Sequence, residues 1–129
     1  MYFAFRTPDG EEITVDVEQH LKTAMMDKSD DYWSIGSGDA AILGGSQFSP
    51  VQLWIIFDGY DHFQLQFVGP GQLPRIAHNT DGTMTAATVK VSGDAINLAS
   101  QTLFPREKAL EIALYFCKTL RPDPRYVWA

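Results

Sequence analysis

The chain of 129 residues has a single cysteine, Cys117, so no disulfide bond can form within it. Cys117 lies in an apolar helical pattern, where a buried and inert thiol is expected. Apolar runs such as Trp54–Phe57 are far shorter than the roughly 20 residues of a membrane-spanning helix. The N-terminal residues lack a basic stretch followed by a long apolar run, so we expect no signal peptide. We therefore expect a cytoplasmic protein without a membrane contact.

Basic side chains are also scarce. Ten Lys and Arg residues stand against sixteen Asp and Glu residues, and the formal net charge is −6. Residues 1–61 carry eleven acidic and three basic side chains, whereas residues 62–129 carry five and seven. Nucleic-acid-binding proteins concentrate positive charge, so direct binding of DNA or RNA is not expected. An acidic half suits a basic protein partner, although acidic surfaces also serve solubility alone.

Residue patterns for catalysis or cofactor binding are missing. The histidines His20, His62 and His78 do not have metal-ligand spacing. The glycine-rich segments 36–39 and 44–46 lack the Gly-Lys-Ser/Thr of a phosphate loop. No Gly-x-Ser-x-Gly motif of a serine hydrolase occurs. We therefore expect no cofactor, no metal ion and no catalytic residue.

Two segments combine acidic residues with aromatic residues. Tyr and Trp are enriched at protein interfaces, and neighbouring carboxylates can pair with the Arg or Lys of a partner. We interpret the acids as surface residues whose reversal to Lys would slow association without harming the fold. The alternative is a Trp packed under the sheet beside acids that only stay solvated. The candidate partner-binding residues are Asp30, Asp31, Tyr32, Trp33, Asp58, Tyr60 and Asp61.

Apolar periodicity predicts the secondary structure. A short helix is expected at 18–28, and a second from Pro105 to Leu120, ended by Arg121-Pro122. Residues 29–38 are predicted to form a polar loop with two exposed aromatic residues. Strands are predicted at 2–6, 12–17, 40–43, 51–57, 62–68, 74–78, 83–91 and 95–99.

Runs of strands between two helices are typical of α+β domains. We expect one domain over residues 1–129. Its centre would be an antiparallel sheet of about five to seven strands, with an early short helix and a C-terminal helix packed on one face.

The C-terminal residues carry a family resemblance. They are the helical run Ala109–Phe116, then Arg121-Pro122, then Val127-Trp128. This order resembles the C-terminus of bacterial polymorphic-toxin immunity proteins, in the family encoded beside deaminase-type toxins. Leu120 stands where that family usually has Gly. The motif residues look structural: Phe116 and Trp128 are expected to pack together, and Arg121 to hold the tail.

The resemblance implies a small α+β domain that binds a cognate secreted toxin, such as a nucleic-acid deaminase, and neutralises it by covering its active site. The partner would have a basic cleft, which an acidic surface complements. Two alternatives remain open. One is a small-ligand-binding module or a subunit of a larger assembly. The other is a small enzyme that combines a histidine with Asp58 or Asp61.

Overall fold

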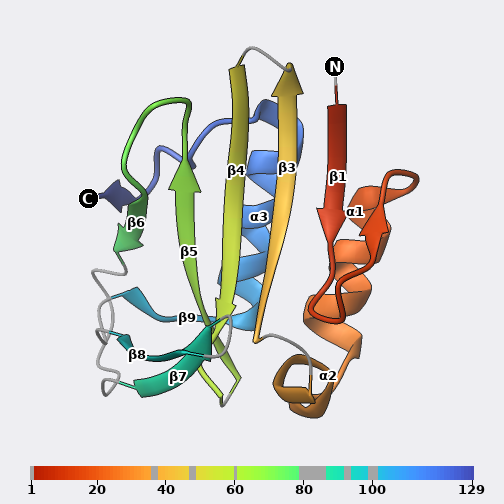
Figure 1. The fold of residues 1–129 in the computed structure, drawn as a ribbon, viewed down its shortest axis with the longest axis vertical. Coiled ribbons are helices and arrows are strands. Elements are labelled where there is room, and N and C mark those ends of the chain that lie inside the picture. Colours follow the sequence, from red (N-terminus) through yellow and green to blue (C-terminus); the bar gives the residue numbers. More distant parts are fainter. Residues whose placement is uncertain are drawn as a thin grey trace.

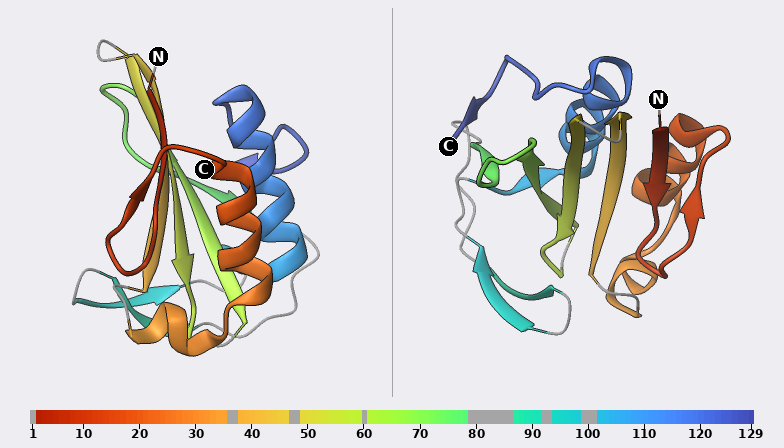
Figure 2. Two further views of the ribbon diagram at one scale, coloured as in Figure 1. Left: turned by 90° about the vertical axis from the view of Figure 1, so that its right-hand side faces the viewer. Right: turned by 45° about the horizontal axis from the view of Figure 1, so that its top comes forward.

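An antiparallel sheet with helices on one face forms the body of the protein (Figures 1 and 2). This architecture comes from a computed structural model, which describes residues 2–35, 38–46, 49–59, 61–78, 87–91, 94–98 and 102–129. The predicted α+β class, with an early short helix and a C-terminal helix on one face of the sheet, is confirmed.

Eight strands of the described chain form the main sheet, in the order β10-β6-β5-β4-β3-β1-β2, with β9 paired to β5. A separate two-stranded ribbon, β7 (Ala87–Val91) and β8 (Asp94–Leu98), lies near the lower end of this sheet (Figure 1). The main strands are β1 Tyr2–Arg6, β2 Glu12–Ile13, β3 Asp39–Ser46, β4 Ser49–Phe57, β5 His62–Val68, β6 Arg75–His78, β9 Phe104–Pro105 and β10 Val127–Trp128.

The strand predictions were close for β1, β4, β5 and β6 and incomplete elsewhere, since the strand predicted at 40–43 continues to Ser46 as β3. The predicted strand 12–17 pairs only at Glu12–Ile13, because the chain turns into a helix at Val17. Strands β9 and β10 were not predicted, because two residues are too few to show an alternation of apolar and polar side chains. They raise the strand number above the predicted five to seven. Residues 83–86 of another predicted strand lie outside the described residues.

The helices occupy one face of the sheet and its lower end. Helix α1 (Val17–Lys22) continues into a π-helical turn, Thr23–Asp27, and lies beside α3 (Arg106–Thr119) (Figure 2). Helix α2 (Asp30–Ile35) lies at the lower end. The prediction of a loop at 29–38 is therefore wrong for 30–35. Within the described residues, none of the helices has the length and apolar character needed to cross a membrane.

Alternation along β4 and β5 decides which side chains meet the helices. Register pairs Leu53 with Phe67 and Ile55 with Leu65, and all four side chains are buried. Burying one such side chain stabilises a fold by about 1.5–3 kcal/mol. The apolar stripe of α3 covers them, and Phe116 meets Phe67 with 6.1 Å between ring centroids. The core residues of the sheet and α3 are Phe5, Ala40, Ile42, Leu53, Ile55, Phe57, Phe63, Leu65, Phe67, Ala77, Phe104, Ala109, Ile112, Ala113 and Phe116.

Helix α3 ends at Leu120 in the left-handed conformation, with φ 56°, and the Leu120 N–H donates to the carbonyl of Phe116 at 2.7 Å. This conformation costs an L-residue about 1–2 kcal/mol, and helices commonly place Gly there. The Leu120 side chain lies against Gly44 of β3, where an added Cβ would be 2.5 Å from Cδ2. Leu120 therefore packs on the sheet, although its backbone conformation is one that favours Gly.

The tail after α3 is held by Asp123 and Arg125. The buried Asp123 carboxylate accepts hydrogen bonds from the Arg125 backbone N–H at 3.0 Å and from its guanidinium at 2.5–3.1 Å. The Asp123 carbonyl accepts the indole N–H of Trp128 at 2.8 Å. Arg125, and not the expected Arg121, is therefore the arginine that binds this carboxylate. Trp128 is half-buried at the margin of the core, where β10 pairs with β6.

Replacing Asp123 with Asn should lower the melting temperature at neutral pH. Burial alone would raise the pKa of Asp123, but the hydrogen bonds and charge of Arg125 hold it below its ordinary value. A depressed pKa stabilises the fold above the unfolded-state value of about 3.9, and this contribution is lost as the pH falls through the folded-state pKa. The difference between wild type and variant should therefore shrink as the pH falls below about 4 in thermal circular dichroism scans.

Glu111→Gln is the matched control for Asp123→Asn. The Glu111 carboxylate lies 4.0 Å from Arg125, and both side chains are 58 % exposed. Exposed ion pairs contribute little to stability, so this variant should melt close to wild type. Equal losses in the two variants would contradict the assignment of Asp123 as the partner that holds Arg125.

Candidate functional site

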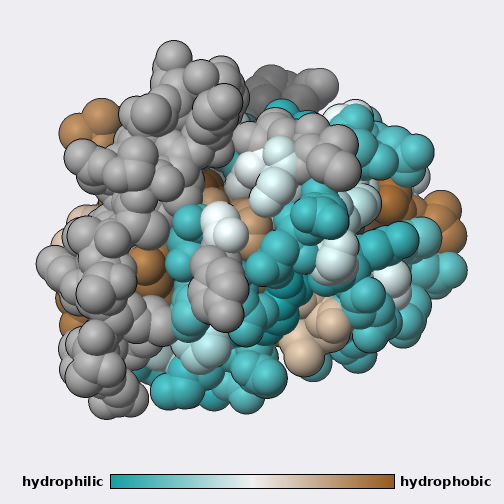
Figure 3. Space-filling view, turned by 90° about the horizontal axis from the view of Figure 1, so that it is seen from below, coloured by the Kyte–Doolittle hydropathy of each residue, from teal (hydrophilic) through white to brown (hydrophobic). Residues whose placement is uncertain are grey.

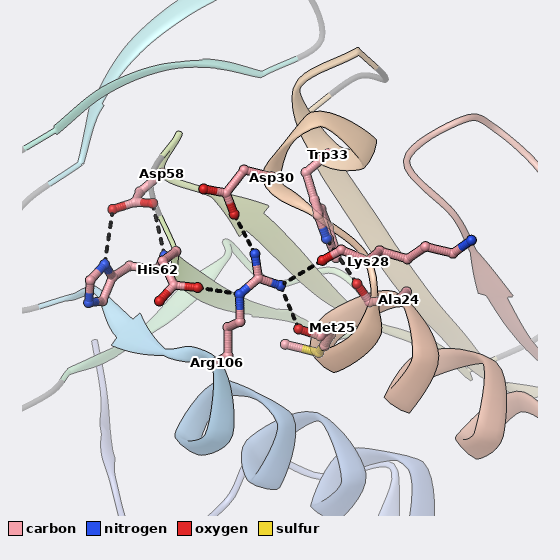
Figure 4. Close-up of polar contacts among 9 residues, drawn as sticks. Ala24, Met25, Lys28, Asp30, Trp33, Asp58, His62 and Arg106 are labelled. Carbon is pink, nitrogen blue, oxygen red and sulfur yellow. Dashed lines mark hydrogen bonds and ion pairs between the residues drawn. The ribbon is translucent and has the colours of Figure 1, made fainter.

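Arg106, the first residue of α3, joins three distant segments of the chain (Figure 4). Its guanidinium donates hydrogen bonds to the carboxylates of Asp30 and Asp61, which are also ion pairs. It also donates to the backbone carbonyls of Met25 at 2.6 Å and Lys28 at 3.4 Å. The side chain is only 13 % exposed. Arginine suits this position because its planar fork carries five N–H donors.

The contacts of Arg106 change the interpretation of the candidate acids. Asp30 and Asp61 are bound within the chain by this guanidinium. Asp58 accepts the backbone N–H of His62 at 3.0 Å, lies 3.6 Å from its Nδ1, and has an 8 % exposed side chain. These three acids are therefore not free surface charges. Their reversal to Lys would break internal contacts, contrary to the expectation that the fold would be spared.

Trp33 is a core residue, not an exposed loop aromatic. Its side chain is fully buried, and its indole N–H donates to the carbonyl of Ala24 at 3.0 Å (Figure 4). Its ring centroid lies 4.8 Å from that of Phe63 and 6.2 Å from that of Phe57. The prediction that Trp33 contacts a partner is thus inconsistent with its burial. Tyr60 lies outside the described residues.

Asp31 and Tyr32 remain at the surface. Asp31 is exposed, and Tyr32 is half-buried on the wall of a cleft of about 330 Å³. This cleft lies between the β1–β2 hairpin, α1 with its π-helical turn, and α2. We call it the hairpin–helix cleft, and its lining residues are Phe5, Thr7, Asp9, Glu11, Ile13, His20, Thr23, Ala24, Lys28 and Tyr32.

The hairpin–helix cleft has an apolar base and a charged rim. Phe5 and Ala24 are buried, whereas Asp9, Glu11 and Lys28 are exposed. The sequence patterns predicted no role for these acids. The local excess of acids in residues 9–12 was the available signal, but it did not reveal that the hairpin folds over a helix.

Electrostatics links the hairpin acids to Tyr32. Burial raises the pKa of the Tyr32 hydroxyl, Asp9 and Glu11 raise it further, and a hydrogen bond with Thr7 opposes them. The hydroxyl of Thr7 donates to Asp9 and accepts the Glu11 N–H at 3.1 Å. The two carboxylates are therefore close enough to act on the Tyr32 hydroxyl, and Lys28 lines the same cleft.

Cys117 does not provide a second candidate site. Burial and, to a smaller extent, Glu18 raise the pKa of the Cys117 thiol to about 12, although Lys118 opposes them. The thiol is thus protonated at neutral pH, which keeps it unreactive. Within the described part of the chain, no group of three or more His, Cys, Asp or Glu residues could hold a metal ion.

No protein-family model matches the sequence, and no curated protein sequence matches it. The resemblance of the C-terminal residues to immunity proteins therefore remains a hypothesis. The arrangement of charges and the hairpin–helix cleft are the features of the structure that bear on function.

Replacing Arg106 with Met should destabilise the fold by about 1–3 kcal/mol, because polar groups lose their hydrogen-bond partner. The partial exposure of Asp30 and Asp61 limits the loss. Chemical denaturation would measure it. Arg121→Met, at the other end of α3, is the matched control because Arg121 is exposed. Surface substitutions of this kind change stability by about 0.5 kcal/mol or less, so equal losses would contradict a linking role for Arg106.

Replacing Trp33 with Ala should cost about 3–5 kcal/mol of unfolding free energy, as expected for a large buried aromatic side chain. Trp54→Ala is the comparison, because Trp54 is half-buried on the opposite face of the sheet, where Arg6 lies 5.0 Å over its ring. We expect a clearly smaller loss there in urea unfolding. A mild effect of Trp33→Ala would show that this side chain is not part of the core in solution.

Proposed function

We propose that this protein is an immunity protein that binds a cognate secreted bacterial toxin and neutralises it by covering its active site. The observation that carries the proposal is the excess of exposed acids on the elements that form the hairpin–helix cleft, two of which, Asp9 and Glu11, line the cleft itself. These acids do not depend on Arg106, and they lie on the hairpin, on α1 with its π-helical turn, and on α2. They are Asp9, Glu11, Glu12, Asp16, Asp27 and Asp31.

An acidic surface of this kind fits a toxin that acts on nucleic acid. Such a toxin needs a basic cleft for its substrate, and opposite potentials speed the encounter of two proteins. Figure 3 shows that the described part of the lower end, on the side of α1 and α2, is mainly hydrophilic. The half-buried Tyr32 adds an aromatic contact of the kind that is enriched at protein interfaces.

The end of α3 supports the family resemblance on physical grounds. The family usually has Gly at the position of Leu120, and here this residue has a left-handed φ of 56°. Gly adopts that conformation without strain. The position therefore has the backbone geometry that the family residue favours, although the side chain differs.

A small-ligand-binding module is the alternative, and the hairpin–helix cleft is the observation that favours it. Its volume of about 330 Å³ is at the lower end of ligand pockets, which span about 300–1,000 Å³. Under this alternative the protein would bind a small molecule at the cleft and would show no affinity for a toxin domain.

Co-expression with the toxin domain encoded by the neighbouring upstream gene tests the proposed function. We expect a stable one-to-one complex on size-exclusion chromatography and rescue of growth. Replacement of Glu11, Asp27 and Asp31 by Lys should slow association by at least about tenfold at low salt, and less at high salt.

The matched control reverses Glu107 and Glu111, which are exposed acids on α3. This double variant should associate much like wild type. Circular dichroism would establish that both variants are folded. Absence of both binding and rescue would overturn the proposed function, and equal slowing by the two variants would move the interface away from the hairpin–helix cleft.

A further inference from the structure

We infer that the hairpin–helix cleft receives one arginine side chain from the partner. The identity of the partner rests on the proposed function, whereas the chemistry of the occupant follows from the cleft. A partner with a basic surface presents many Arg and Lys side chains, and the walls of this cleft select among them.

The base of the cleft suits the apolar stem of a long basic side chain. Phe5 and Ala24 close the bottom of the cleft but are almost fully covered, so a stem would contact the half-buried Ile13 at the margin of the same core. Lys and Arg bury such stems along apolar surface while the charged head stays at a polar rim. The volume of about 330 Å³ is small for ligand pockets, which suits one side chain better than a large molecule.

The rim supplies acceptors for a guanidinium. Asp9 and Glu11 line one side, and both act electrostatically on the Tyr32 hydroxyl. A guanidinium carries five donors in a plane and is weakly hydrated, so it can bind two carboxylates and lie against the Tyr32 ring together. The ammonium of a Lys is more strongly hydrated and does not stack in this way.

The chain already places one of its own cations against Tyr32. The Nζ atom of Lys28 lies 5.3 Å from the centroid of the Tyr32 ring, which is within the range of a cation–π contact. Lys28 is exposed and also lines the cleft. Lys28 therefore competes for the Tyr32 ring, and the arginine of a partner must displace it.

Arg106 holds the helical wall of the cleft in place. Its guanidinium binds the carbonyls of Met25 and Lys28, which lie just before α2. The indole of Trp33 binds the carbonyl of Ala24 on the same wall. A wall fixed by these contacts loses little further freedom when the cleft is filled, and such preorganisation favours binding.

The test uses N-acetyl-arginine methylamide as a probe in amide NMR titrations of the full chain. We expect saturable shifts confined to residues 5–13 and 20–32, with a dissociation constant on the order of 1 mM. N-acetyl-glutamate methylamide and N-acetyl-norleucine methylamide should produce no such shifts. Shifts that are absent, spread over the surface or equal for the neutral probe would overturn the inference.

Two variants sharpen the test. Glu11→Gln should weaken binding of the arginine probe about two- to fivefold, and Lys28→Ala should strengthen it by freeing the Tyr32 ring. Glu111→Gln is the matched control, because Glu111 is an exposed acid on α3 that does not line the cleft. Equal weakening by Glu11→Gln and Glu111→Gln would overturn the inference, because it would reflect general charge only.

The outcomes of the probe experiment and of the toxin experiment are independent of each other. A toxin complex that forms while the arginine probe leaves the cleft unperturbed would overturn this inference and keep the proposed function. Selective arginine binding without any toxin complex would support the chemistry of the cleft and overturn the proposed function.

Discussion

The ion pairs of Arg106 with Asp30 and Asp61 determine how the lower end of the molecule is assembled. They connect the start of α3 to the start of α2 and to the turn between β4 and β5. A guanidinium that is 13 % exposed has lost much of its hydration, and an unpaired charge in that position is strongly unfavourable. The hydrogen bonds to Met25 and Lys28 complete its coordination. The conformation of the segment before α2 is therefore coupled to α3.

The same assembly explains why an acidic and aromatic segment became part of the core. With Asp30 fixed, α2 directs Trp33 inward against Phe57 and Phe63, while Asp31 and Tyr32 stay at the surface. Interfaces and cores use the same aromatic residues, because both gain from burying large rings. Composition alone therefore cannot tell a contact residue from a core residue. Here the contact of Arg106 with Asp30 positions α2 so that Trp33 becomes a core residue.

The sequence predicted those elements that are long enough to show a repeating pattern of apolar residues. Strand β5 alternates over seven residues, and β4 ends in the apolar run Trp54–Phe57. Helix α3, which follows Pro105, carries an apolar stripe over fourteen residues. Helix α2, with six residues, is too short for a helical period to stand out. The partners of Arg106 lie 45 and 76 residues away, and no local pattern encodes such distances. Of the candidate residues, Asp31 and Asp61 are exposed as predicted, Tyr32 is only half-buried and lies on a helix, and the hairpin side of the cleft was missed.

The contacts that stabilise the end of α3 and the tail lie in the region of the family resemblance, and the cleft lies on other elements. Leu120 covers Gly44, and beyond it Asp123 holds Arg125 and the indole of Trp128. The hairpin–helix cleft is built from β1, β2, α1 and α2. Substitutions around its rim would leave the C-terminal contacts intact, because the rim residues Asp9 and Glu11 take no part in them. A scaffold of this kind can keep its helix end while its binding surface changes with the partner, and the proposed function would use that separation.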